Sequence, residues 1–153
     1  MFQSNKDNKL NEETERDLDQ DLKVTKDLNK EMTDLSEVYY YWSRKKSFKK
    51  KVIEKRKLEL DIWLAEKRAQ ITEKYFSEVP ASKQPSIKVK EEKIMMDHKK
   101  EYVEKKIEII YLERDYDDFS GALEALKLKG SMLIQLGAED RMESKFGGMH
   151  INE

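Results

Sequence analysis

The chain of 153 residues has 41% charged and 37% hydrophobic residues, a mean hydropathy of −0.94 and a net charge of −1. Apolar material is too scarce for a conventional globular core, whereas 5 glycines, 2 prolines and abundant Lys, Glu and Leu are typical of long helices. The absence of cysteine excludes disulfides and thiolate metal sites, and no apolar run approaches the ~20 residues of a membrane helix. We therefore expect an all-α cytoplasmic protein without a membrane partner.

The N-terminal half of the chain is expected to be mainly helical. Residues 1–17 are polar and acidic, and we expect them to be disordered. Residues 18–79 are expected to form a helical region. From about Ser36 to Phe76 this region contains neither glycine nor proline, and its apolar residues recur at spacings of roughly 3, 4, 7 and 8. This pattern predicts one long amphipathic helix.

A linker is predicted at residues 80–90, because the stretch from Ser77 to Ser86 holds both prolines and three serines. The IKVK sequence that begins at Ile87 fits a short extended piece. Helices are then predicted through residues 91–141, followed by a flexible tail at residues 142–153. The expected architecture is an elongated helical hairpin or bundle.

The C-terminal helical region has a heptad pattern. Apolar residues recur every seven positions in two series offset by three, and from Ile109 to Leu133 only Gly130 interrupts them. Another helix must cover such a seam, either from the same chain or from a second copy. Because the chain is short of hydrophobic residues, we expect the seam to join copies in a coiled-coil-like homo-oligomer. The predicted oligomerisation residues are Ile109, Leu112, Tyr116, Phe119, Leu123, Leu126 and Leu133.

Charge is distributed unevenly along the chain. Residues 39–79 carry 12 basic and 6 acidic side chains, whereas residues 1–38 carry 6 and 11, and residues 80–153 carry 13 and 15. Nine basic residues and one acidic residue lie between Arg44 and Lys57. A dense cluster of cations suits a polyanion, and the overall neutrality of the chain conceals it.

Aromatic residues accompany the cations, with Trp42 before the cluster, Phe48 within it and Trp63 after it, a combination that suits single-stranded nucleic acid. Packing between helices is the favoured interpretation for the two tryptophans. Six cations form two series spaced by eleven residues, which drift by only about 20° around a helix and so line one flank. The alternative is an ordinary solvated helix face. The predicted nucleic-acid-binding residues are Arg44, Lys45, Lys46, Lys49, Lys50, Lys51, Arg56, Lys57, Lys67 and Arg68.

No catalytic constellation is evident. Asp115, Asp117 and Asp118 lie close to Glu113 and have the chemistry of a two-metal nuclease centre, but acidic clusters on helices are usually solvated faces. The chain contains neither of the two glycine-rich phosphate-binding motifs. We therefore expect a protein that is not an enzyme and has no cofactor or metal.

Three stretches of the chain together match the pattern of a known protein family. The first similar stretch is the lead-in DLKVTKDL, which begins at Asp21. The second is a Tyr-Trp pair followed by the basic helix, which ends in Tyr75-Phe76. The most specific is DFSGALEALKLKG, which begins at Asp118 and continues as SMLIQLGAEDR to Arg141.

The chain thus resembles the UvsY-type recombination mediators of tailed phages. This resemblance implies an all-helical homo-oligomer that forms a ring and binds single-stranded DNA. Such proteins are not enzymes. They help a RecA-like recombinase to load onto strands covered by single-strand-binding protein, in the host cytoplasm if phage-encoded. The resemblance also implies that Lys67 and Arg68 contact DNA. Two alternatives remain: a coiled-coil structural or assembly protein, such as a scaffold or adaptor, and a DNA-annealing protein or nuclease subunit.

Overall fold

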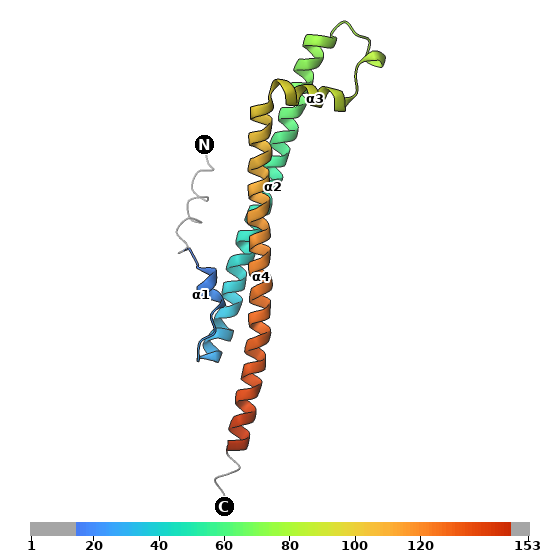
Figure 1. Ribbon diagram of the computed structural model, residues 1–153. Helices are drawn as coiled ribbons and strands as arrows, with labels where there is room; N and C mark the ends of the chain where they lie inside the picture. The colour runs from blue at the N-terminus through green and yellow to red at the C-terminus, as the bar shows by residue number, and fades with distance from the viewer. Residues whose placement is uncertain (1–14, 148–153) are drawn as a thin grey trace, which may run out of the picture. The chain divides into compact units, whose positions relative to one another are not determined.

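The computed structural model describes residues 15–147, and every regular element in this range is helical (Figure 1). The long helices are α2 (Leu28–Phe76) and α4 (Lys99–Gly147). The all-α prediction is thus confirmed. The shorter elements are α1 (Leu18–Leu22), a 3-10 helix (Ala81–Lys83) and α3 (Ile87–Asp97).

The chain divides into two compact units. Within the described range, unit 1 contains residues 15–42 and 121–147, and unit 2 contains residues 43–120. None of the helices between residues 15 and 147 is long and apolar enough to span a bilayer. Each unit has its own buried side chains.

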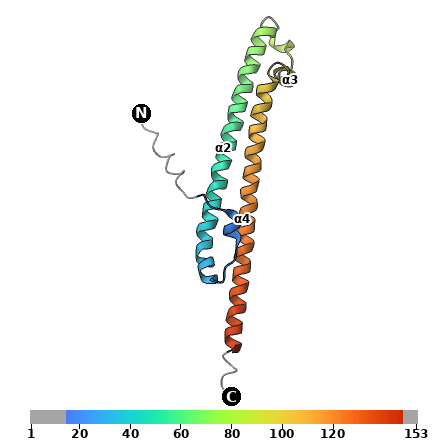
Figure 2. The same ribbon diagram turned by 60° about the vertical axis from the view of Figure 1, so that its left-hand side comes forward.

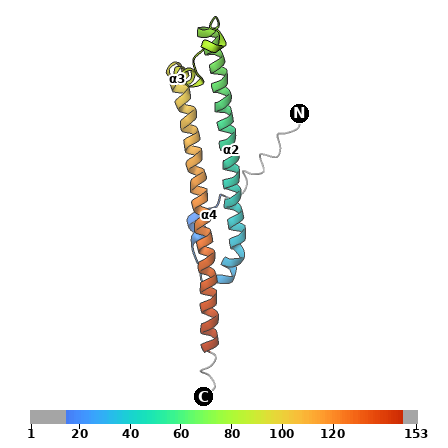
Figure 3. The same cartoon turned by 90° about the vertical axis from the view of Figure 1, so that its right-hand side faces the viewer.

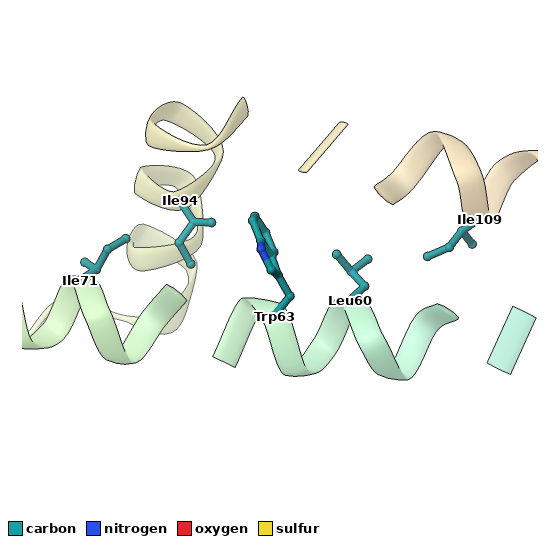
Figure 4. Packing of buried hydrophobic residues seen from close by; sticks show 5 residues of the cluster. All are labelled: Leu60, Trp63, Ile71, Ile94 and Ile109. Carbon is teal, nitrogen blue, oxygen red and sulfur yellow. The ribbon is translucent and has the colours of Figure 1, made fainter. Parts of the chain in front are cut away.

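Unit 2 is a helical hairpin in which α2 and α4 run side by side in opposite directions (Figures 2 and 3). Its core takes residues from three helices. Figure 4 shows Leu60, Trp63 and Ile71 of α2 pointing toward Ile94 of α3 and Ile109 of α4. Burial of these large apolar side chains stabilises the hairpin.

The break between α3 and α4 lies at His98. Its backbone leaves helical geometry, with φ −126° and ψ 34°, while its N–H still donates to the Ile94 carbonyl at 2.8 Å. The His98 carbonyl in turn accepts from the Tyr102 N–H at 3.0 Å. One helical hydrogen bond therefore closes α3 and another opens α4 on either side of the break.

Unit 1 combines an apolar core with a buried ion pair. Leu126 and Leu133 of α4 are fully buried. The ammonium of Lys129, on the same helix, is 2.6 Å from a Glu31 carboxylate oxygen and donates to the Asp21 backbone carbonyl at 2.6 Å. The segment that carries α1 is thereby tied to α4.

A second set of polar contacts in unit 1 converges on the Asp21 carboxylate. The Trp42 indole N–H donates to it at 2.9 Å, and the Arg16 guanidinium pairs with it at 3.2 Å. The hydrogen bond and charge of Asp21 raise the pKa of Arg16 above its ordinary value, although partial burial opposes this. These contacts hold the residues before α2 in place.

Three boundary predictions need correction. The predicted linker at residues 80–90 is shorter, because α3 begins at Ile87, where the Ser86 hydroxyl caps the helix by accepting from the Val89 N–H at 3.4 Å. The expected extended piece is therefore helical. The predicted tail at residues 142–153 starts too early, because α4 continues to Gly147. The predicted disordered segment at residues 1–17 lies mainly outside the described residues.

Candidate nucleic-acid interface

All ten predicted nucleic-acid-binding residues lie on α2 within unit 2. The structure divides them between two faces of the helix. Several point toward α3 and α4 of the same unit, and others point to solvent. The cations of the first face contact neighbouring helices, although Lys57 stays about half exposed, and those of the second face are exposed.

The inward face is defined by four cations that form ion pairs across the hairpin. Lys49 lies 2.8 Å from Asp115, and Lys57 lies 2.6 Å from Glu113. The partner of Arg56 is Glu108 at 2.8 Å, and that of Arg68 is Glu91 at 3.2 Å. Much of the predicted phosphate track is therefore already neutralised by carboxylates of the same chain.

Two further cations of the spaced series contact aromatic rings. The Lys46 ammonium lies 5.1 Å from the centre of the Tyr116 ring, and the Lys67 ammonium lies 5.9 Å from that of Trp63. Lys67 also donates to the Gln70 side chain at 3.4 Å. Cations placed over ring faces are stabilised by the ring quadrupole. Lys46 thereby links α2 to α4, whereas Lys67 packs on a ring of its own helix.

Arg56 also pairs along its own helix, 2.6 Å from Glu59. Its hydrogen bond to Glu59 is the main cause of the raised pKa of Arg56 and of the lowered pKa of Glu59. Both shifts favour the charged forms, so the guanidinium keeps its carboxylate partners throughout the neutral range.

The outer basic face consists of Arg44, Phe48, Lys51 and Lys55, which recur every three or four residues on the solvent side of α2. Lys50 is also exposed but lies about 100° around the helix from Lys51. The Phe48 ring is 60% exposed. Within residues 15–147 neither Lys50 nor Lys51 forms an ion pair. This face therefore offers accessible cations around an accessible ring.

Lys55 lies on the outer basic face but is absent from the predicted set of nucleic-acid-binding residues. It does not belong to either series spaced by eleven, and those series directed attention to the flank that faces α4. The signal that would have found it is the spacing of four and three residues from Arg44 through Phe48 and Lys51. Lys55 is largely exposed and lies 3.9 Å from Glu59.

The tryptophans belong to the helix packing, as the sequence favoured. Trp63 is buried, and its indole N–H donates to Glu101 at 2.9 Å. Trp42 is half-buried and hydrogen-bonded to Asp21. Neither ring is presented for base stacking, whereas Tyr40 in unit 1 is exposed.

The acidic cluster on α4 is tied to the inward face. Asp115 and Glu113 pair with Lys49 and Lys57, as described above. Across residues 15–147, no group of three or more His, Asp or Glu side chains is placed to hold a metal ion. Asp115 and Glu113 thus help to hold α4 against α2 in unit 2.

The heptad seam is largely covered within one chain. Ile109 is buried in unit 2, and Leu123, Leu126 and Leu133 are buried in unit 1. Leu112, Tyr116 and Phe119 are half-buried. The expectation that the chain cannot bury this seam alone is therefore wrong at the four buried positions. Association of copies through the seam stays a prediction.

Comparison of the chain with models of known protein families, with curated proteins and with solved structures finds no match. The resemblance to UvsY-type mediators therefore stays a prediction that depends on the sequence stretches described above.

Proposed function

We propose that the protein is a non-catalytic recombination mediator. It binds single-stranded DNA as a homo-oligomer and helps a RecA-like recombinase to load onto strands covered by single-strand-binding protein. The observation that carries the DNA-binding step is the outer basic face, where the exposed Phe48 lies one helical turn from Arg44 and Lys51. The recombinase-loading step of the proposal depends on the sequence resemblance.

Two properties of the outer basic face support this proposal. Its cations contact phosphates without reading sequence, and such contacts weaken steeply with salt. An exposed aromatic ring stacks on any base, typically contributing about 1–3 kcal/mol per base. A mediator needs contacts that are general and reversible, and repetition of a weak site in an oligomer supplies avidity.

A second candidate is a coiled-coil structural or assembly protein. It is favoured by the ion pairs of the inward face, which use Lys49, Lys57 and Arg68 to hold α2 against α3 and α4. In that case the cation cluster serves the hairpin, and the outer basic face is only a solvated surface.

Binding of labelled oligothymidine, measured by fluorescence anisotropy at several salt concentrations, separates the two candidates. Lys50→Ala/Lys51→Ala should weaken binding and reduce the slope of log K against log salt by about 0.7 for each lost phosphate contact. Phe48→Ala should weaken binding with little change of slope, because stacking involves no counterion release. Lys49→Ala/Lys57→Ala is the matched control, since it removes the same charge from the inward face.

Unchanged affinity and slope in Lys50→Ala/Lys51→Ala would reject the outer basic face. A larger loss in Lys67→Ala/Arg68→Ala would instead place the strand on the inward side, as the resemblance implies. No binding by the wild-type chain would favour the structural candidate. The loading step is tested by measuring whether the protein stimulates a recombinase on strands coated with single-strand-binding protein, and whether Lys50→Ala/Lys51→Ala loses that stimulation.

A further inference from the structure

Unit 2 has an exposed apolar stripe on α4. The α4 stripe consists of Val103, Ile107, Ile110 and Tyr111, whose exposed fractions range from 40% to 61%. Their spacing places them along one face of the helix. The buried Ile109 lies on the opposite side, where α4 meets α2. Helix packing inside the unit therefore leaves the α4 stripe uncovered.

A corresponding stripe lies on α2. The α2 stripe consists of Leu58, Ile62, Ala65 and Ala69, all of which are exposed. The core residues of α2 lie nearly opposite, given about 100° of rotation per residue. The two alanines have short side chains, so the backbone of another helix can approach α2 closely here.

The charges beside the two stripes are complementary. Three exposed carboxylates, with one lysine at Lys55, accompany the α2 stripe, and three exposed lysines, with one carboxylate at Glu104, accompany the α4 stripe. Among residues 15–147, none of the three carboxylates beside the α2 stripe and none of the three lysines beside the α4 stripe forms an ion pair. The carboxylates are Asp61, Glu66 and Glu73, and the lysines are Lys99, Lys100 and Lys106.

We infer that the α2 stripe of one copy packs against the α4 stripe of another, with the two helices antiparallel. This pairing brings the carboxylate-lined apolar surface against the lysine-lined one, so complementary charges surround an apolar centre. Because the two stripes face nearly opposite directions, one copy cannot satisfy both with a single partner. The contact is heterologous, and repeated addition gives a ring if it closes or a filament if it does not.

This inference rests on the self-association in the proposed function, and it is tested without DNA. It assigns the contact between copies to exposed residues of α2 and α4 rather than to the buried positions of the heptad seam. Sedimentation velocity without DNA should show an oligomer for the wild-type chain. Ile62→Glu and Ile107→Glu should each give a monomer, because a charge placed in an apolar contact is costly. Ile134→Glu, which changes an exposed isoleucine of unit 1, is the matched control and should leave the oligomer intact.

A mixing experiment tests the heterologous geometry. An Ile62→Glu chain keeps its α4 stripe, and an Ile107→Glu chain keeps its α2 stripe. Their equimolar mixture should therefore form a dimer that cannot grow further. Helicity measured by circular dichroism should match the wild type in both variants, since both positions are exposed.

Charge reversal gives a second, independent variant. Glu66→Lys/Glu73→Lys should weaken the oligomer, and adding Lys99→Glu/Lys100→Glu in the same chain should restore it. A wild-type monomer, persistence of the oligomer in both glutamate variants, or failure of their mixture to dimerise would each overturn the inference. DNA binding by a monomeric Ile107→Glu chain, with the salt response of the outer basic face, would leave the DNA-binding proposal standing by itself.

Discussion

The two units use the same kinds of side chain in different ways. In unit 1 the ion pair between Lys129 and Glu31 is nearly removed from water, with the two side chains 7% and 15% exposed. In unit 2 a pair with the same 2.6 Å separation, Lys57 with Glu113, is about half exposed, at 54% and 45%. Distance alone therefore says little about what each pair contributes.

The difference in burial decides the energetics. A half-exposed pair is screened by water and typically contributes about 0–1 kcal/mol. Breaking a buried pair by removing one partner leaves an uncompensated charge and typically costs about 3–5 kcal/mol. Unit 1 thus depends strongly on a polar contact, whereas unit 2 depends mainly on its apolar core of Trp63, Ile94 and their neighbours.

The largest effect is expected when the buried pair of unit 1 is broken. Lys129→Met keeps the apolar stem but removes the donor to Glu31 and to the Asp21 carbonyl. The free energy of unfolding should fall by about 3–5 kcal/mol in urea denaturation. The control is Lys127→Met, two residues away, because its exposed pair with Glu124 should contribute little to stability. Equal effects of the two changes would contradict the contrast between buried and exposed pairs.

Acid should weaken unit 1 through Glu31. Its hydrogen bond to Lys129 is the main cause that lowers the pKa of Glu31 below its ordinary 4.5, despite opposing burial. The unfolded chain therefore binds this proton at a higher pH than the folded chain does. The stabilisation is complete above about pH 4.5 and is lost as pH falls through the lowered pKa of the folded state. Urea denaturation can be repeated at steps of about one pH unit between about pH 3 and 6. The free energy of unfolding should then depend less on pH for Glu31→Gln than for the wild type. Identical profiles would exclude Glu31 as a contributor.

The smallest effect is expected for the exposed pair of unit 2. Lys57→Ala and Glu113→Ala should each lower the free energy of unfolding by about 0–1 kcal/mol, and the loss should shrink in high salt. A double-mutant cycle isolates the coupling between the two side chains. A coupling of several kcal/mol would mean that exposed pairs stabilise unit 2 as strongly as the buried pair stabilises unit 1.

The helices follow directly from residue patterns. The absence of glycine and proline from Ser36 to Phe76 correctly predicted most of α2, which begins earlier at Leu28. The Ser86 cap that starts α3 was overlooked, because two prolines and several serines nearby are equally typical of a linker. The continuation of α4 to Gly147 shows that a polar, exposed helix end resembles a flexible tail in sequence.

The candidate site was harder to predict because the basic residues and the buried apolar residues of α2 recur with nearly the same period. Cations spaced by eleven residues lie along α2 beside its buried core residues and flank them on both sides. From there Lys57 and Arg68 reach carboxylates on neighbouring helices. Flanking positions of this kind form ion pairs across helix contacts as readily as they face solvent. Only the partner helices decide between the two, and one helix's sequence does not contain that information.

The two tryptophans give the molecule one intrinsic fluorophore in each unit. Trp42 belongs to unit 1 and donates to Asp21, whereas Trp63 belongs to unit 2 and donates to Glu101. The chain contains no other tryptophan. Replacing either one with phenylalanine leaves an emission signal that reports on a single unit, so local unfolding of each can be followed separately without an added label.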